Sequence, residues 1–375
     1  MARDIQARLA RLRRRRAGTD RLDRLGAGEQ RELLEKSQRL QETWQTRSRD
    51  SYTGYALGAM QEVGADYTRI CLETATRVGE QLNTRLTALG HQVAFRLQGS
   101  VPLNTHIRGV SDVDLLSLDT NYYTYDLAGA RNRAGLYINP TPLTSVSVLS
   151  TLRRRAERAL ASAYPAATVD TSGSKAITIS GGSLARPVDV VPSHWHDTSG
   201  YQASGQEKDR GVRVLDKTVP VAIDNLPFLH IHRISERDGL ALGGLKKAIR
   251  LCKSIKNDVE EGEHRQIDLS SYDIASILYH ANVAALLAGY THELAILAEA
   301  QRYLDWLYHH KTDAEQLIVP DGSRRIFDTP ERWASLLTLS CELDDLVKEV
   351  ANELNPVGPA RSMADCRNLL AIAYV

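Results

Sequence analysis

The 375-residue sequence has few of the features that mark secreted, membrane-spanning or zinc-binding proteins. Its four cysteines, Cys71, Cys252, Cys341 and Cys366, are scattered without C-x-x-C spacing, which supports neither a disulfide framework nor a zinc ribbon. No run of about 18 apolar residues occurs, so no transmembrane helix is expected. The N-terminus lacks the apolar core of a signal peptide. We therefore predict a cytoplasmic protein.

An excess of charge of one sign is also missing. Lys and Arg number 47 against 46 Asp and Glu, which gives a formal net charge of +1. With 42% hydrophobic and 25% charged residues, the chain has an ordinary globular composition and the length for two domains or one bilobal enzyme. This balance excludes a nucleic-acid surface covering the whole protein, so any basic patch must be local.

The most informative stretch is residues 95–119, which read FRLQGSVPLNTHIRGVSDVDLLSLD. If 112–118 is a strand, Asp112 and Asp114 lie at positions i and i+2 and point to the same face. Two neighbouring carboxylates favour a hard cation such as Mg²⁺ between them. Gly99 and Ser100, just upstream, are typical of a turn whose backbone N–H groups bind phosphate. The pattern predicts chemistry on a metal-bound nucleoside triphosphate.

A third carboxylate lies in a second apolar run, Val188-Asp189-Val190-Val191. An acid inside a buried strand is costly to bury unless it has a partner. We therefore expect Asp189 to meet the same metal ions as Asp112 and Asp114. Two histidine pairs, His194-x-His196 and His230-x-His232, have no accompanying cysteine or acidic cluster, so a zinc site is not predicted there.

Two further motifs occur in the C-terminal half. Residues 243–256 read GGLKKAIRLCKSIK and predict a helix on which Lys246, Arg250 and Lys253 form one basic stripe. Solvation explains such a stripe, and so does an anion facing it. Leu269-Ser270-Ser271-Tyr272-Asp273 opens another helix, with Ser270 or Ser271 as its N-cap.

Together, Gly-Ser, D-x-D and the distant strand Asp resemble the nucleotidyltransferase superfamily of the DNA polymerase beta type. I-R-L-x-K and S-S-Y make the chain most similar to the cGAS/DncV-like nucleotidyltransferases (CD-NTases) of bacterial antiphage systems, over about residues 55–350. The resemblance implies an α+β fold. A mixed-sheet palm with flanking helices would be followed by a C-terminal helical lobe that closes the nucleotide cleft.

The resemblance also assigns roles to residues. It implies that Asp112, Asp114 and Asp189 are catalytic and bind two Mg²⁺ ions, with Mn²⁺ as a substitute. Nucleotide-binding roles fall on Gly99 and Ser100 in the palm and on a second set from the helical lobe: Lys246, Arg250, Lys253, Ser271 and Tyr272. Tyr272 would stack on the donor base. Thr105 and Ser111 would tie down the phosphate-carrying loop, and Arg108 is either a phosphate contact or a surface charge.

The implied function is synthesis of a cyclic di- or trinucleotide second messenger from ATP- or GTP-type ribonucleotides, for antiphage defence. Implied partners are the nucleoside triphosphates, a regulatory protein or activating ligand, and a downstream effector reached through the product, with no membrane partner. Two alternatives stay open. One is another nucleotidyltransferase that tails RNA or nucleotidylates a protein or small molecule. The other is a catalytically silent scaffold.

The expected organisation is an N-terminal helical extension (1–50), a palm with its spine helix (51–225) and a helical lobe (226–375). Leu and Ile recur at helical spacing in the extension, broken near Gly26 and Gly28. Its Arg13–Arg16 run is interpreted as a solvated or partner-docking helix in preference to a nucleic-acid patch. One long helix is expected over 51–90, strands at 92–98, 167–170, 175–180 and 187–191, and a helix over 144–163 whose arginines are solvated.

Overall fold

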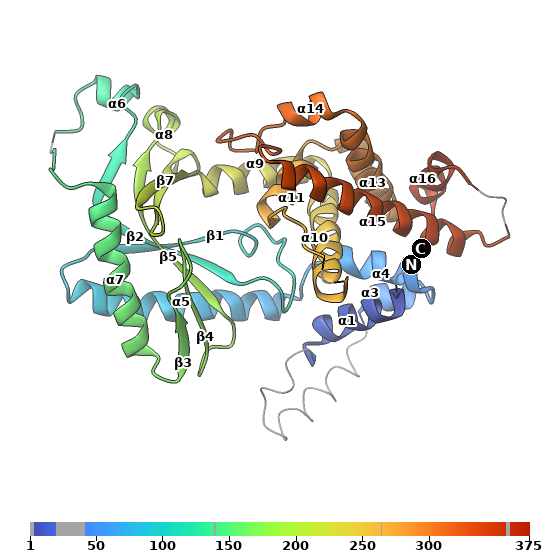
Figure 1. Cartoon of the computed structure of the whole chain (residues 1–375), viewed down its shortest axis with the longest axis horizontal. Helices are drawn as coiled ribbons and strands as arrows, with labels where there is room; N and C mark the ends of the chain where they lie inside the picture. Colours follow the sequence, from blue (N-terminus) through green and yellow to red (C-terminus); the bar gives the residue numbers. More distant parts are fainter. Residues whose placement is uncertain (1–3, 20–41, 139, 264, 358–360) are drawn as a thin grey trace. The chain divides into compact units, whose positions relative to one another are not determined.

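The computed structural model describes residues 4–19, 42–138, 140–263, 265–357 and 361–375, coloured along the sequence in Figure 1. This part of the chain packs into two compact units. The helical unit comprises the described residues of 1–63, 104–111 and 234–375, and the palm unit comprises 64–103 and 112–233. No helix of the described residues is both long and apolar enough to span a membrane.

The palm unit is built on one mixed sheet with the strand order β1-β2-β5-β4-β3. Only β2 (Val113–Tyr125) and β5 (Val188–Asp197) are parallel. The flanking strands β1 (Val93–Gln98), β4 (Ile177–Gly181) and β3 (Ala167–Asp170) are antiparallel to their neighbours. The second half of β5 pairs with β6 (Gly211–Asp216), which pairs with β7 (Val221–Asn225). The predicted α+β palm strands are confirmed.

Two long helices, α5 (Ala65–Thr87) and α7 (Ser145–Ala163), pack against the sheet, as Figure 1 shows. Side chains alternate along the strands, so odd-numbered β2 residues and even-numbered β5 residues face these helices. That face is the palm core; its members are at most 3% exposed and include Val113, Leu115, Ile177, Ile179, Val188 and Val190. The opposite face carries a second buried cluster, made of Leu116, Leu118, Val191, Trp195, Val212 and Val214. Asp114 and Asp189 lie on this opposite face, at the start of β2 and β5, where the strands are partly exposed.

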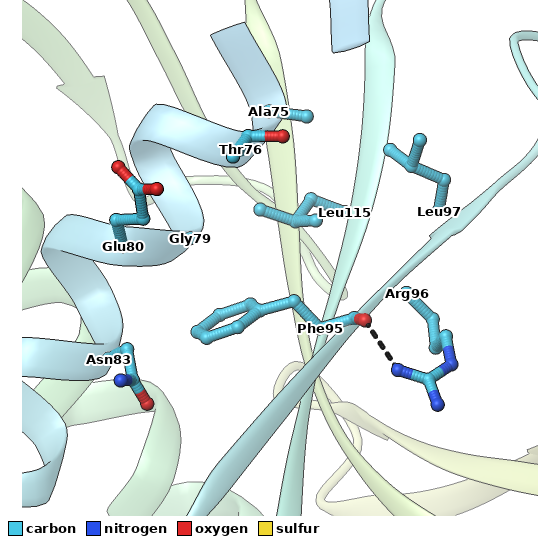
Figure 2. Close-up of a pocket in the computed structure, with 9 residues that line it drawn as sticks. All are labelled: Ala75, Thr76, Gly79, Glu80, Asn83, Phe95, Arg96, Leu97 and Leu115. Carbon is cyan, nitrogen blue, oxygen red and sulfur yellow. Dashed lines mark hydrogen bonds between the residues drawn. The ribbon is translucent and has the colours of Figure 1, made fainter. Parts of the chain in front are cut away.

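A cavity of about 450 Å³ remains where α5 passes the edge strand β1. Figure 2 shows Phe95 and Leu115 pointing from the strands toward the helix. Gly79 permits this close approach, because a Cβ there would lie 3.3 Å from the Phe95 ring. The cavity lies on the core side of the sheet.

The helical unit surrounds α10 (Gly244–Glu263), whose apolar side is buried at Leu245, Ile249, Cys252, Ile255 and Val259. The preceding helix, α9 (Pro227–Leu240), continues from the palm unit. The other helices of this unit are α1 (Ile5–Ala17), α3 (Thr43–Arg47), α4 (Ser51–Met60), α11 (Ser271–Tyr279), α12 (Val283–Ala288), α13 (Leu294–His309), α14 (Lys311–Gln316), α15 (Pro330–Leu354) and α16 (Met363–Ile372). The C-terminal α16 packs against α13 and α15.

The single helix predicted over 51–90 is wrong. It is two helices, because Gln61 at the end of α4 takes an extended backbone (φ −69°, ψ 145°) and Gly64 caps the start of α5. The two helices fall in different compact units. The predicted boundaries at residues 50 and 225 stay predictions.

The solvated interpretation is wrong for Arg15 and Arg153, whereas the other arginines of the two runs are exposed or partly exposed. On α1, Arg15 forms a buried ion pair with Asp258, and Arg8 forms one with Glu342. On α7, Arg153 is 3% exposed and donates hydrogen bonds to backbone carbonyls of residues 173–176. Buried carboxylates and loop carbonyls require donors, and long guanidinium side chains supply them. The predicted break near Gly26 and Gly28 lies outside the described residues.

Candidate functional site

The palm carboxylates are positioned by strand register. In the parallel pair of β2 and β5, Asp114 lies directly opposite Asp189, so both side chains leave the same face of the sheet. Asp112 immediately precedes β2. All three aspartates are partly exposed, in contrast to the buried valines between them. The structure therefore brings together two carboxylates that are 75 positions apart in the sequence and places the third next to them in the chain.

Gly99 closes the site from the side of β1, where Gln98 lies opposite Asp114. Its backbone is left-handed, with φ +73°, and a Cβ there would lie 2.1 Å from Oδ2 of Asp114. Both observations require glycine at this position. Ser100 follows in the same turn. The Gly-Ser turn thus brings bare backbone against the carboxylate of Asp114, where a phosphate-binding turn is predicted.

A residue that sequence reasoning missed is Thr178 on β4. It lies opposite Asp189 in the register, and its hydroxyl donates a 2.6 Å hydrogen bond to Oδ1 of Asp189. This bond fixes the rotamer of the carboxylate. The available signal was alternation, because Thr178 is the polar residue between Ile177 and Ile179 on a predicted half-buried strand.

In the helical unit, Arg250 and Lys253 both point into the loop 104–111. Arg250 donates to the carbonyls of Met60 and Asn104, each at 2.7 Å, and Lys253 donates to the carbonyl of Thr105 at 2.8 Å. Burial lowers the pKa of Arg250 to about 10. Lys246, less buried, forms a 3.7 Å ion pair with Asp238. The predicted stripe is therefore two buried cations and one peripheral cation; their roles toward phosphate stay predictions.

The loop itself is tied by its own hydroxyl groups. The Ile107 N–H donates to Oγ of Ser111 at 3.0 Å, which agrees with the predicted loop-fixing role, and Thr105 is buried. Arg108 donates to the carbonyl of Arg16 at 2.8 Å. This loop ends one residue before Asp112.

The S-S-Y motif opens α11. Ser270 is the N-cap, as predicted, in a capping box with Asp273. Ser271 is exposed at the first helical position. The Tyr272 hydroxyl donates to Asp321, and burial together with this carboxylate raises the pKa of Tyr272 well above its ordinary value. The ring is thereby held in one orientation, which a base-stacking role requires; that role stays a prediction.

The histidines of the palm have structural surroundings. His194 is fully buried in β5, its Nδ1–H donates to the Trp195 carbonyl at 2.8 Å, and burial lowers its pKa to about 4. Within the described ranges, no group of three or more His, Cys, Asp or Glu side chains forms a ready-made metal cage.

A divalent cation nevertheless fits the palm carboxylates. Their donors are hard oxygens, which Mg²⁺ prefers. Asp114 and Asp189 present them from the same face at paired register positions, and the missing side chain of Gly99 lets the Asp114 carboxylate lie against the backbone of the Gly-Ser turn. Two registered carboxylates without a cation would repel each other.

Comparison with known proteins agrees with this geometry. Residues 233–338 match the cGAS/DncV-like nucleotidyltransferase C-terminal helical domain. The cyclic dinucleotide synthase CdnE of Yersinia aleksiciae is 44% identical over 361 residues, which is 93% of either chain. A c-di-GMP synthase of a Lachnospiraceae bacterium is 31% identical over 287 residues, covering 71% of this chain and 80% of the relative.

The fold agrees as well. The solved structure of a STING-associated CdnE c-di-GMP synthase from Flavobacteriaceae sp. is 22% identical, with a TM-score of 0.72, and covers 98% of this chain and 99% of that structure. The predicted family and the α+β fold with a C-terminal helical domain are confirmed. The chain belongs to the cGAS/DncV-like nucleotidyltransferases, and it is a nucleotidyltransferase enzyme.

Proposed function

We propose that this enzyme joins two ribonucleoside triphosphates into a cyclic dinucleotide. The observation that carries the proposal is the register pairing of Asp114 with Asp189 beside Gly99, in a chain 44% identical to a relative named a cyclic dinucleotide synthase. The same register gives no support to a silent scaffold, which has no need of paired carboxylates on an open strand face. Of the two ring sizes predicted from the sequence, the named relatives favour the dinucleotide.

The metal-binding residues in this proposal are Asp112, Asp114 and Asp189, with Mg²⁺ as the ion and Mn²⁺ as its substitute. Bound ions supply charge neutralisation of the triphosphate and activation of the attacking hydroxyl. The backbone N–H groups of the turn at Gly99 and Ser100 bind the β- and γ-phosphates. Thr178 keeps the Asp189 carboxylate in a single rotamer.

The reaction consists of two transfers of the same type. In each, the Asp189 carboxylate helps the acceptor ribose hydroxyl to lose its proton. The hydroxyl oxygen then bonds to the α-phosphorus of the donor, the bond from the α-phosphorus to the bridging oxygen breaks, and pyrophosphate leaves. The first transfer gives a linear dinucleotide, and the second closes the ring.

The product would act as a second messenger in antiphage defence, through a downstream effector. A structural neighbour that makes c-di-GMP is named STING-associated, which supports an effector that recognises a cyclic dinucleotide. In this proposal a regulatory protein or an activating ligand controls the activity of the enzyme.

The test incubates purified protein with all four labelled ribonucleoside triphosphates and Mg²⁺ or Mn²⁺, followed by phosphatase treatment and chromatography. Phosphatase-resistant product is expected from the wild type. The Asp112→Ala/Asp114→Ala double variant is expected to give none. Mass spectrometry then identifies the two bases. Extension of an added RNA primer without cyclic product would contradict the proposal.

A further inference from the structure

A short hairpin of the helical unit contacts the start of α11, where the S-S-Y motif lies. It is part of the connection between α14 and α15, and we call it the 317–326 hairpin. Ile318 and Arg325 pair across it in an antiparallel bridge, and its turn is Pro320-Asp321-Gly322, where Gly322 has a φ of +81°. None of the residues predicted to bind substrate or metal belongs to this hairpin.

The turn of the hairpin fixes the hydroxyl end of Tyr272. Asp321, in the turn, is 6% exposed. One of its carboxylate oxygens accepts the hydrogen bond from the Tyr272 hydroxyl, and the other accepts a 2.9 Å bond from the Ser323 N–H. The bond from Ser323 is local to the turn and orients the carboxylate. The hydroxyl of Tyr272 therefore has an acceptor that is itself held in place.

The returning arm of the hairpin covers one face of the same ring. The guanidinium carbon of Arg324 lies over Tyr272, 5.4 Å from the centre of the ring. The guanidinium also donates to the carboxylate of Asp273, which is buried and follows Tyr272 in α11. Asp273 thus orients Arg324 and compensates its charge. For this reason a phosphate is not assigned to Arg324, and its contact with the ring is what remains to be explained.

The start of α11 is complete without the contacts to Tyr272. Ser270 and Asp273 form a capping box, which satisfies backbone N–H groups at the start of the helix. Asp321 and Arg324 instead fix a side chain, and that side chain is partly exposed. A ring that is fixed before a ligand binds loses no rotamer entropy on binding. The hairpin therefore prepares the ring of Tyr272 for a flat ligand.

We propose that Asp321 and Arg324 are positioning residues for the donor nucleotide, and that they act by holding the ring of Tyr272 in the plane on which the base stacks. Arg324 lies over one face of the ring, so the base packs against the other face. This inference rests on the proposed function, because the base belongs to the donor triphosphate of that reaction.

The test is calorimetric binding of the α,β-methylene analogues of ATP, GTP, CTP and UTP to the full chain with Mg²⁺. These analogues cannot release pyrophosphate, so binding is measured without turnover. For the analogue that the wild type binds most tightly, Asp321→Ala and Arg324→Gln should each weaken binding at least fivefold. The matched control is Arg325→Gln, a change to the exposed neighbouring arginine of the same hairpin.

A mutant cycle separates positioning from packing. Tyr272→Leu removes the ring and should weaken binding at least as much as either hairpin change. Because Asp321 and Arg324 act through that ring, Asp321→Ala and Arg324→Gln should have no further effect on binding in the Tyr272→Leu background. A hairpin that only anchors the helix would lower the melting temperature in both backgrounds and leave nucleotide affinity unchanged.

Three results would overturn the proposal: unchanged binding in Asp321→Ala and Arg324→Gln, equal losses with and without the Tyr272 ring, or a wild type that binds none of the four analogues. Circular dichroism establishes that each variant is folded. If Asp321→Ala or Arg324→Gln fails to fold, the comparison passes to Tyr272→Phe, which breaks the same hydrogen bond from the other side, and to Arg324→Lys. Unchanged binding in both then rejects the positioning role.

The proposed function is judged separately by the cyclic product of the wild type. Cyclic product together with unchanged binding in the hairpin variants would reject only the positioning role of Asp321 and Arg324. Weakened binding in these variants without cyclic product from the wild type would support the nucleotide contact and reject the proposed cyclisation.

Discussion

Gly99 is the residue whose replacement most directly tests the palm site. In Gly99→Ala the new methyl group would overlap Oδ2 of Asp114, so this carboxylate must move from the position it holds at the register pair with Asp189. Misplacement of a catalytic group by about 1 Å can cost on the order of 100-fold in rate. We expect cyclic product formation to fall by about that factor or more, measured by the phosphatase-resistant assay.

Gly90 provides the matched control for this change. Its φ of +83° resembles that of Gly99, yet a Cβ there meets no atom within 4 Å. Gly90→Ala and Gly99→Ala therefore share a left-handed strain of about 1–2 kcal/mol, seen as lowered melting temperature, but only Gly99→Ala displaces a carboxylate. Equal activities in the two variants would show that the contact with Asp114 is unimportant.

Thr178 should act on catalysis through Asp189. Thr178→Val removes the hydroxyl but keeps the shape, so the carboxylate loses its 2.6 Å donor. Groups that orient metal-binding side chains are typically worth about 10- to 100-fold in metal affinity or activity. We expect a higher Mg²⁺ concentration for half-maximal activity and a lower maximal rate.

The conservative variant separates positioning from packing. Thr178→Ser keeps the donor and should restore most of the activity, whereas a purely structural role would leave Thr178→Ser as impaired as Thr178→Val. Titration with Mn²⁺ provides a second readout. If Thr178 orients the Asp189 carboxylate, its loss lowers the affinity for the metal, whereas a packing defect lowers only the stability of the protein.

These residues also show which parts of the candidate site can be predicted from the sequence alone. D-x-D and the acid within an apolar run singled out Asp112, Asp114 and Asp189, because charged groups in apolar runs are costly without a function. Thr178 and the burial of Arg153 were missed, since each depends on a partner brought close only by folding. The partners of Arg153 are loop carbonyls about 20 positions away along the chain.

Among the helices and strands, α1 is the part of the N-terminal extension whose attachment to the helical unit can be tested by mutation. Arg15 is 6% exposed and lies 3.0 Å from Oδ1 of Asp258, whose other oxygen accepts a 2.6 Å hydrogen bond from Tyr55. Removing one partner of a buried ion pair typically costs about 3–5 kcal/mol. Arg11 also reaches Asp258, at 3.3 Å, so the loss in Arg15→Met should be smaller, about 2 kcal/mol.

Chemical denaturation measures this loss as the change in free energy of unfolding. Arg13→Met is the control, because Arg13 belongs to the same arginine run and is exposed. A surface change of this kind is expected to stay within about 0.5 kcal/mol. If Arg15→Met proves equally neutral, α1 is not held to the helical unit by this ion pair.

The elements that were predicted correctly share strong local signals. The strand β4 alternates polar and apolar residues, and α11 begins at a serine capping box. The single helix expected over 51–90 is wrong for two reasons. Because α4 is buried on nearly all sides, its sequence has no alternation of apolar and polar faces that would show where the helix ends. The break at 61–64 also contains no proline. Glycine alone is a weak breaker, and tertiary packing decided the ends of both helices.

At the scale of the whole molecule, the resemblance to a known family predicted the fold correctly. It did not predict that each compact unit is made of stretches that are separated in the sequence. Residues 104–111 pack with the helical unit although they connect two stretches of the palm unit. Arg250 and Lys253 account for this through two hydrogen bonds, to the backbone carbonyls of Asn104 and Thr105. Periodicity placed both cations on one helix face but could not tell a loop carbonyl from a phosphate as their acceptor.

Metal binding should therefore be visible in the stability of the whole protein, independently of turnover. An ion that binds only the folded state stabilises it by about 2.7 kcal/mol at 100 times its Kd. Thermal melting of the metal-free protein should shift upward by several degrees on adding Mn²⁺. Far-UV circular dichroism should not change, because the palm core consists of buried apolar side chains such as Val113, Ile177 and Val190 and includes none of the three aspartates. Asp189→Asn weakens one of the two registered donors and should lose most of the shift. The same shift in the wild type and in the Asp189→Asn variant would mean that the stabilising ion binds elsewhere and that Asp189 is not a metal ligand.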